Sequence, residues 1–410
     1  MQIEGLKLFT MRKDVKGDVA VLVTQAGFLG IFYGIFNIIA HSIFLARFDV
    51  SYLGPVYAIS GMAGLSFAFL YSQLKRRLKF NLLSQSIFGF ILLAVLALGV
   101  MMVLEPGNGV IFTILVLLGP LYILALMSLR ESTGLLFHGR YMGNTASIIE
   151  DPAIVGAIIG SFAVPALLSA GMNLPAIFLI TSLCILVVLI IESFSVKRNP
   201  GELLPVSKDP GEVNLLTCLI NIRYSRSIAI FLLASVVLLF FVQYSFLSAA
   251  HENYPGENDM AVFLGIFEGS ALVFALIIKS LFSPFLIKNH GLRVAVILGP
   301  VLIAIFGLAA AISGSVQGYT PAASGFLILF LFLSVSRFLS RAFSGSVDVM
   351  VRKIFLQALS KEIRQRISSA FSGIFNEIAV IISGLLLTLA GSVVFLRLIH
   401  FAWALPLLSI

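Results

Sequence analysis

Apolar segments of about 20 residues, separated by short polar stretches, follow one another from residue 19 to the end of the chain. An α-helix of that length crosses the ~30 Å hydrocarbon core of a bilayer, whereas a membrane strand needs only about 10 residues and alternates in polarity. The pattern therefore predicts an all-α membrane protein with about twelve transmembrane helices. The predicted spans are residues 19–46, 50–74, 80–104, 110–130, 152–169, 175–192, 227–248, 260–286, 294–313, 325–346, 370–391 and 394–410.

Composition and charge agree with a multi-pass membrane protein and orient it. Hydrophobic residues make up 59% of the chain, charged residues only 11%, and the mean hydropathy of +1.07 lies outside the usual range of soluble domains. Of the 27 Lys and Arg residues, 22 fall on the side of the predicted spans that holds the N-terminus. Short basic loops stay in the cytoplasm, so we expect a cytoplasmic N-terminus in the cytoplasmic (inner) membrane. The formal charge of +8 then reflects topology, and no nucleic-acid partner is expected.

A polar stretch at residues 197–214 divides the predicted spans six and six, and a short amphipathic piece at 215–226 follows it. We therefore expect an N-terminal six-helix bundle at 1–196, a cytoplasmic linker at 197–226 and a C-terminal six-helix bundle at 227–410. The halves echo each other at an offset of about 210 residues, since SQLKRRLKF after the second span corresponds to SPFLIKNHGLR after the eighth. Two parallel repeats place a substrate route between them, near the bilayer midplane.

Two arginines inside the tenth span are the residues that most need an explanation. A helix puts Arg337 and Arg341 on one face, one turn apart, and Arg337 would lie roughly 16 Å deep, near the bilayer centre. Each would cost about 2.5 to 3.5 kcal/mol there, which points to an interior cavity and an anion that binds both. The other interpretation is that they reach the cytoplasmic interface or pair with acids that lock the fold. The polar stripe on this face comprises Ser334, Arg337, Arg341, Ser344 and Asp348.

Glu377 and its neighbour Asn376 are the predicted partners of these arginines. Both lie about two turns into the eleventh span, at a depth close to that of Arg341 if the tenth and eleventh spans are antiparallel. A buried pair of Arg341 with Glu377 would satisfy both charges, and an anionic substrate could compete for the arginine. Glu377 could equally be a protonatable coupling group, and the sequence leaves both roles open.

The eighth span contributes Glu268 and Lys279, which are eleven residues apart and therefore share a helical face. Glu268 lies between Gly265 and Gly269, so this helix can approach a neighbour closely while the acid faces a cavity. We count both charges as coupling or gating candidates. For Lys279 the alternative is that its long stem carries the ammonium group to the cytoplasmic surface.

The first span has small and polar residues on one face. Asn37 and His41 stand one turn apart and are predicted to contribute hydrogen bonds to a substrate site, with helix packing and an interfacial histidine as the alternative. Small residues at the remaining positions allow close helix contact, as they do in the fifth span. These glycines are Gly27, Gly30 and Gly34 in the first span and Gly156 and Gly160 in the fifth.

Enzymatic signatures are missing from the sequence. The five histidines are scattered, Cys184 and Cys218 are isolated, and no phosphate-binding G-x-x-x-x-G-K-[ST] motif occurs. We expect no metal, no cofactor and no enzymatic activity. Transport by this chain would then be driven by a gradient or by exchange.

Three stretches carry a resemblance to a known family: SIFLARFDVSYLGPVYAISG at 42–61, VFLGIFEGSALVFALIIKSLFSPFLIKNHGLRVAVILGP at 262–300 and LSKEIRQRISSAFSGIFNEIAVIISGLLL at 359–387. They resemble the ATP/ADP carrier-like branch of the major facilitator superfamily, which includes bacterial members fused to cytoplasmic HEAT-repeat or cyclic-nucleotide-binding domains. The resemblance implies a major facilitator-type fold with twelve helices in two pseudo-symmetric six-helix bundles. It also implies alternating access and a nucleotide-like or other anionic substrate.

The sequence thus predicts a secondary transporter that moves an organic anion, nucleotide-like or amphipathic, by alternating access. Two other functions stay open: a lipid transporter or flippase, and a membrane sensor or anchor for a cytoplasmic domain. The last apolar run reaches Ile410 without a basic anchor, so we expect the native chain to continue there, with a cytoplasmic domain as a candidate partner.

Overall fold

The computed structural model describes residues 13–104, 107–136, 145–198, 223–319, 325–357 and 374–392. The earlier helices are α1 (Lys13–Arg47), η2 (Val50–Tyr52), α2 (Leu53–Arg77), α3 (Phe80–Leu104), α4 (Asn108–Leu136), α5 (Thr145–Ser169) and α6 (Leu174–Arg198). The later ones are α8 (Arg223–Asn253), α9 (Glu257–Ile277), η3 (Ile278–Phe282), α10 (Ser283–Gln317), α11 (Phe326–Ser344), α12 (Val347–Gln357) and α14 (Asn376–Ser392).

The predicted spans correspond to helices wherever the structure describes the chain. Within those ranges nine helical stretches are long and apolar enough to cross a bilayer, and α14 contains a shorter apolar helix at Asn376–Ala390. One of the nine runs from Glu257 to Gln317 and contains the eighth and ninth predicted spans, separated by a kink at Gly291. The predicted twelfth span at 394–410, most of the linker and the amphipathic piece at 215–226 lie outside the described residues.

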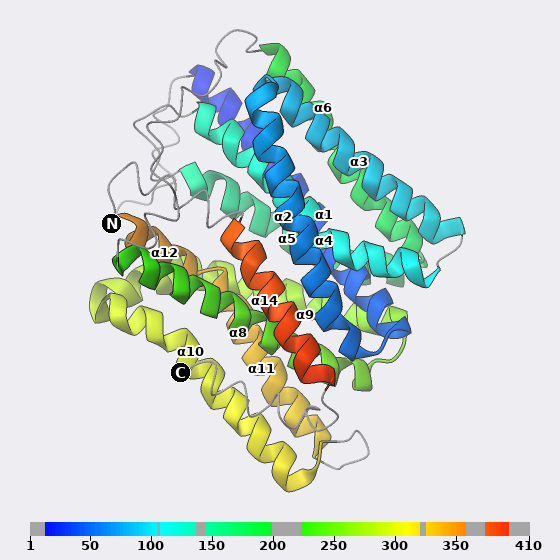
Figure 1. Cartoon of the computed structure of the whole chain (residues 1–410), viewed down its shortest axis with the longest axis vertical. Coiled ribbons are helices and arrows are strands. Elements are labelled where there is room, and N and C mark those ends of the chain that lie inside the picture. Colours follow the sequence, from blue (N-terminus) through cyan, green and yellow to red (C-terminus); the bar gives the residue numbers. More distant parts are fainter. Residues whose placement is uncertain are drawn as a thin grey trace.

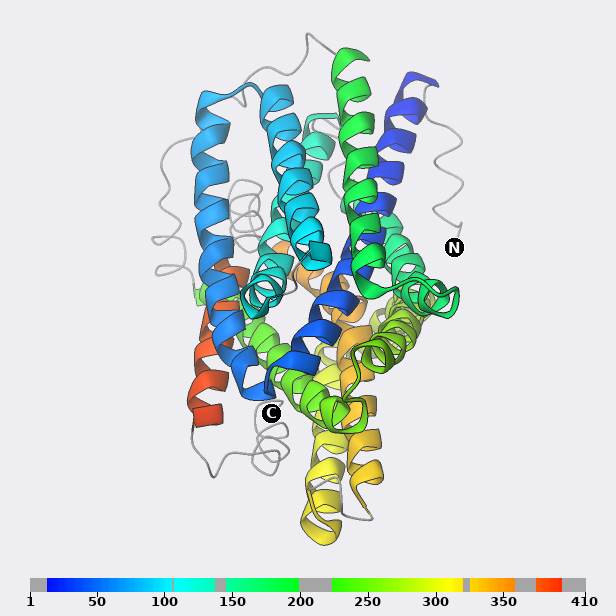
Figure 2. The same cartoon turned by 90° about the vertical axis from the view of Figure 1, so that its right-hand side faces the viewer.

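Helices from the beginning and the end of the chain lie side by side most extensively in two places. Figure 1 shows α14 running along α2, and the turned view in Figure 2 keeps the same two helices together. The other place is the contact of α5 with α9. Among the early helices α1 packs on α4, α5 and α6, while among the later ones α11 packs on α8, α9 and α10. The candidate site described below lies between the early helices and the later ones, and its lining residues come from α1, α8, α9 and α11.

Glycines allow the close helix contacts that the sequence predicts. A Cβ on Gly30 of α1 would lie 2.8 Å from the backbone nitrogen of Ala157 in α5, and one on Gly160 would lie 2.5 Å from the carbonyl oxygen of Ile31. The α1 and α5 backbones therefore touch directly. On α9, a Cβ at Gly265 would come within 2.7 Å of Pro165 on α5. The predicted small-residue faces are confirmed, and they fix the rotation of α1 and α9.

The eighth span is not a uniform α-helix. Five residues at Ile278–Phe282 form a π-helical turn, and the helix then continues to the kink at Gly291, where φ is 80°. That backbone conformation favours glycine because a Cβ would clash with the chain. Large apolar side chains such as Leu281 (71% exposed) and Phe194 (68%) point outward, as expected of a surface that meets lipid. The π-helical turn holds Lys279, which the sequence singles out.

Candidate functional site

Both arginines of α11 bind one carboxylate. Nη2 of Arg337 donates a hydrogen bond to Oε1 of Glu268 at 3.0 Å, and Nε of Arg341 donates to Oε2 at 3.1 Å. The exposed fraction of the side chain is 8% for Arg337, 25% for Arg341 and 7% for Glu268. The α9 and α11 helices therefore share an ion triad with two positive charges and one negative charge, buried at Arg337 and Glu268 and partly exposed at Arg341.

The predicted pairing of Arg341 with Glu377 is wrong. Glu377 is buried on α14 against Gly64 of α2, and it accepts a hydrogen bond from the side-chain amide of Asn376 at 3.1 Å. Depth in the bilayer places Glu377 and Arg341 at a similar level, but α14 packs along α2 and α8, so its acid is carried away from α11. Glu377 and Asn376 thus belong to the α2–α14 contact and not to the arginine cluster.

A chain of neutral groups lies beside the ion triad. Nδ1 of His41 is 2.8 Å from the carbonyl oxygen of Asn37, and its Nε2 is 3.1 Å from the side-chain nitrogen of Gln243. The Gln243 amide also donates to the Tyr57 hydroxyl at 3.1 Å. Because a carbonyl oxygen only accepts, Nδ1 carries the proton and Nε2 accepts from Gln243. These bonds describe a neutral imidazole and join α1 and α2 to α8.

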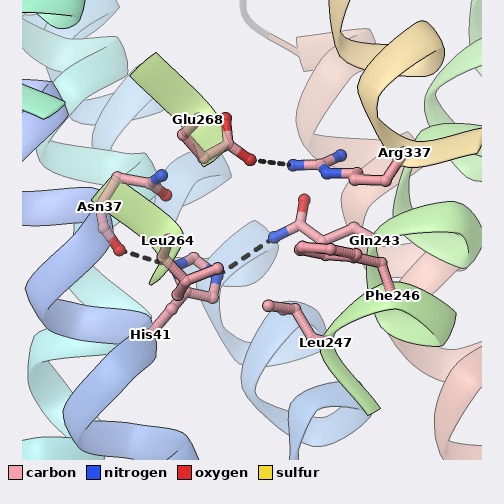
Figure 3. Close-up of a pocket in the computed structure, with 8 residues that line it drawn as sticks. All are labelled: Asn37, His41, Gln243, Phe246, Leu247, Leu264, Glu268 and Arg337. Carbon is pink, nitrogen blue, oxygen red and sulfur yellow. Dashed lines mark hydrogen bonds and ion pairs between the residues drawn. The ribbon is translucent and has the colours of Figure 1, made fainter. Parts of the chain in front are cut away.

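A small cavity connects this polar chain to the triad. Figure 3 shows His41, Gln243, Glu268 and Arg337 converging on it from α1, α8, α9 and α11. The cavity volume is about 10 Å³, which is room for about one water molecule. Its lining residues are Asn37, His41, Gln243, Phe246, Leu247, Leu264, Glu268 and Arg337. Three predicted site residues, Asn37, His41 and Glu268, therefore meet Arg337 here.

Two stacked tyrosines lie beside Arg341. The rings of Tyr33 on α1 and Tyr122 on α4 are 4.2 Å apart between centroids, with an interplanar angle of 28°. Both tyrosines interact electrostatically with the Arg341 side chain. A guanidinium group next to a stacked aromatic pair can bind an anion and a flat ring at the same time.

Several donors of α11 are buried without a partner. Nε of Arg337 and the hydroxyls of Ser334, Ser336 and Ser340 have no hydrogen-bond partner among the described residues. A buried N–H of a charged group without an acceptor is costly. The unmatched Arg337 nitrogen is a point where an acceptor from a ligand would be stabilising.

Three further ion pairs, at two places, join early helices to later ones. Nζ of Lys279 lies 2.7 Å from Oδ1 of Asp151 and 3.6 Å from Oε2 of Glu150, both on α5. The Lys279 side chain is only 17% exposed, so the predicted alternative of a lysine reaching the surface does not describe it. Toward the opposite ends of α1 and α9, Nε of Arg47 is 3.1 Å from Oε1 of Glu257.

Several polar residues of the interior were not predicted from the sequence. Gln243 is a single amide in an otherwise apolar run, FFVQYSF, and that isolation was a usable signal. Glu192 on α6 is 4% exposed and accepts hydrogen bonds from Gln25 at 2.7 Å and Ser84 at 2.6 Å. It had no motif or helical partner in its own span to draw attention. The pairing of Glu268 with Arg337 was not predicted, although both residues had been selected as site candidates.

Comparison with known proteins identifies the fold. No protein-family model matches the chain, and no curated protein does so either. Solved structures do: the nucleoside transporter NupG (16% identity, 96% of this chain, 97% of that chain, TM-score 0.64) and its D323A mutant (16%, 96%, 98%, 0.66). A POT family transporter in complex with a thioalcohol-conjugated peptide is also similar (13%, 95%, 94%, 0.64).

These similarities, at identities this low, define the fold. The chain is a multi-pass, all-α membrane protein with a major facilitator-type fold, which confirms the predicted fold class. The three similar structures are transporters by name. They show the fold alone and do not reach the ATP/ADP carrier-like branch that the sequence resembles.

Proposed function

We propose that this protein is a secondary transporter that carries an organic anion by alternating access. The observation that carries the proposal is the uneven charge of the ion triad: Arg337 and Arg341 together have one more positive charge than Glu268 can neutralise. An uncompensated charge in a low-dielectric interior is expensive unless a ligand binds it. A membrane anchor has no need of such an excess, which favours transport over the sensor or anchor function.

The site residues take distinct roles in this proposal. Arg337 and Arg341 bind the anionic group, and Asn37 and His41 supply hydrogen bonds from α1. Glu268 holds the arginines in place between transport events. Glu377 with Asn376 acts at the α2–α14 contact, where a change in helix packing accompanies each cycle. The α2–α14 and α5–α9 contacts, which both join an early helix to a late one, are where sliding between halves 1–196 and 227–410 is expected.

Alternating access needs contacts that close one side of the route at a time. The pair of Arg47 with Glu257 and the contact of Lys279 with Asp151 are candidates for the two closures, since each joins an early helix to a late one. Lys279 sits in the π-helical turn, a feature often found at functional positions. With a cytoplasmic N-terminus, the Arg47 pair lies at the outer face and the Lys279 cluster at the inner face.

The substrate class follows from the groups beside the arginines. The Tyr33 and Tyr122 stack next to Arg341 suits an anion that carries a flat ring. This agrees with a nucleotide-like substrate, as the resemblance to ATP/ADP carrier-like proteins implies. A nucleoside transporter is among the proteins with a similar fold, and its name agrees with a substrate of this kind.

A ligand-stabilisation screen tests the proposal. Purified protein is heated with nucleotides, aromatic and aliphatic organic acids, or lipids, because a ligand that binds the folded state raises the melting temperature. We expect anions to stabilise the wild type and the exposed control Arg293→Ala, but not Arg337→Ala. Uptake into proteoliposomes should be lost with Arg337→Ala while the protein remains inserted. Unchanged anion binding in Arg337→Ala would contradict the assignment of Arg337 to the binding site. Stabilisation by lipids alone would favour the lipid transporter or flippase.

A further inference from the structure

The central site holds a fixed set of formal charges. Arg337 and Arg341 contribute two positive charges and Glu268 one negative charge, while Asn37 and Gln243 are neutral. The hydrogen bonds of His41 describe a neutral ring. Lys279 pairs with carboxylates of its own, Asp151 and Glu150, at the contact of α5 with η3. Among the side chains that the structure describes, those of the central site therefore carry a net formal charge of +1.

The carboxylate of Glu268 divides its two oxygens between the arginines. Oε1 accepts from Arg337 and Oε2 from Arg341, so each guanidinium group receives one oxygen of Glu268. Nε of Arg337 remains without an acceptor among the described residues, although the residue is only 7% exposed. With Glu268 bound, the arginines can still donate hydrogen bonds to one further anionic group. One unit of positive charge remains for that group to neutralise.

We infer that Glu268 sets the charge of the transported molecule, so that the central site selects anions with a single negative charge. The inference rests on the proposed function, because it assigns the substrate of the same site. A monoanion brings the closed site to neutrality, whereas a dianion leaves one uncompensated negative charge in a low-dielectric interior and a neutral molecule leaves one positive charge. Glu268 is in this sense a specificity-determining residue.

Matched probes with one skeleton and different charge test the inference. Adenosine, adenosine 3′,5′-cyclic phosphate and AMP carry charges of zero, minus one and about minus two at pH 8, because the second phosphate ionisation has a pKa near 6. Benzoate and phthalate form an independent pair of carboxylates. Binding to purified full-length protein is measured by thermal stabilisation and by competition, which give a ratio of monoanion to dianion affinity.

Variants then change the site charge by known amounts. Glu268→Gln raises it to +2, so the ratio should shift toward AMP and phthalate by about tenfold or more, since a full charge is removed within hydrogen-bond distance. The double variant Glu268→Gln with Arg341→Gln returns the charge to +1 and should restore the preference for monoanions. It also relieves the repulsion between the arginines, so it keeps the test open if the single variant fails to fold. Glu192→Gln, another buried glutamate, is the matched control and should leave the ratio unchanged.

The outcomes separate this inference from the proposed function. If no probe anion binds wild-type protein, the anion site itself is wrong. If anions bind but the ratio favours dianions in the wild type, or is the same in wild type, Glu268→Gln and the double variant, then the anion site stands and charge selection by Glu268 is overturned. A preference that follows the site charge through all three proteins supports the inference.

Discussion

Removing Glu268 should destabilise the protein more than removing either arginine. Glu268→Gln takes away two charge-assisted hydrogen bonds, of 3.0 and 3.1 Å, and leaves two guanidinium groups one helical turn apart without a counter-charge. Breaking a buried pair by removing one partner costs about 3 to 5 kcal/mol. Arg337→Gln loses a single charge-assisted bond while Glu268 keeps Arg341, so we expect a loss of about 1.5 to 3 kcal/mol.

The smallest effect in the triad belongs to Arg341. Its side chain is 25% exposed, so solvent screens part of the interaction, and Arg341→Gln should cost about 1 kcal/mol. Glu192→Gln is again the control, because the Glu192 partners Gln25 and Ser84 are neutral and its replacement removes a buried charge. We expect that control to change the unfolding free energy by about 1 kcal/mol or less.

Unfolding can be followed through the chain's own cysteine. Cys184 is 6% exposed and free, so it reacts with a maleimide dye only when the helices separate, provided that Cys218 is replaced by serine. A double-mutant cycle between Glu268 and Arg337 should give a coupling free energy of about 1 to 3 kcal/mol. The reasoning is refuted if Arg337→Gln costs more than Glu268→Gln, or if the coupling is below about 0.5 kcal/mol.

Two further predictions concern contacts between early and late helices. Gly64→Ala should lower transport and stability because the new Cβ would collide with the Glu377 carboxylate. The control Gly89→Ala meets open space and should be neutral or stabilising by up to about 1 kcal/mol. Equal effects of the two variants on uptake and melting temperature would contradict this. Lys279→Glu should reduce proteoliposome uptake about tenfold, because the new carboxylate repels Asp151. Adding Asp151→Lys should recover most of the uptake, since the swap restores the 2.7 Å pair. No recovery would rule out a charge contact.

The location of the site was more predictable than its pairing. Hydropathy alone placed α11 across the bilayer and Arg337 near its middle, and the helical period put Arg337, Arg341 and Ser344 on one face. The sequence also shows Glu268 between Gly265 and Gly269, and both glycines contact α5 in the structure. Span boundaries were right to within several residues because a bilayer fixes helix length.

Pairing across helices required the tertiary structure. Depth is one coordinate, and it made Glu377 the predicted partner of the arginines. The neighbour of each helix in the membrane plane gave them Glu268 instead. The tertiary structure was also needed to find the hydrogen-bonded chain of Gln243, Tyr57 and His41. Its members are far apart in sequence, and each is an isolated polar group in its own span. The regular α-helical period also gave no sign of the π-helical turn at Lys279.

The sequence by itself determined the solvent, the spans and the polar face of α11, because the cost of exposing backbone and charge to lipid acts on each helix separately. Only the tertiary structure decided that one glutamate serves two arginines and that the acid of α14 lies elsewhere. The physical reason is that lateral packing is set by shape, through contacts such as Gly30 on Ala157 and Gly384 on Ala58, and shape complementarity between distant segments leaves no periodic signal in either one.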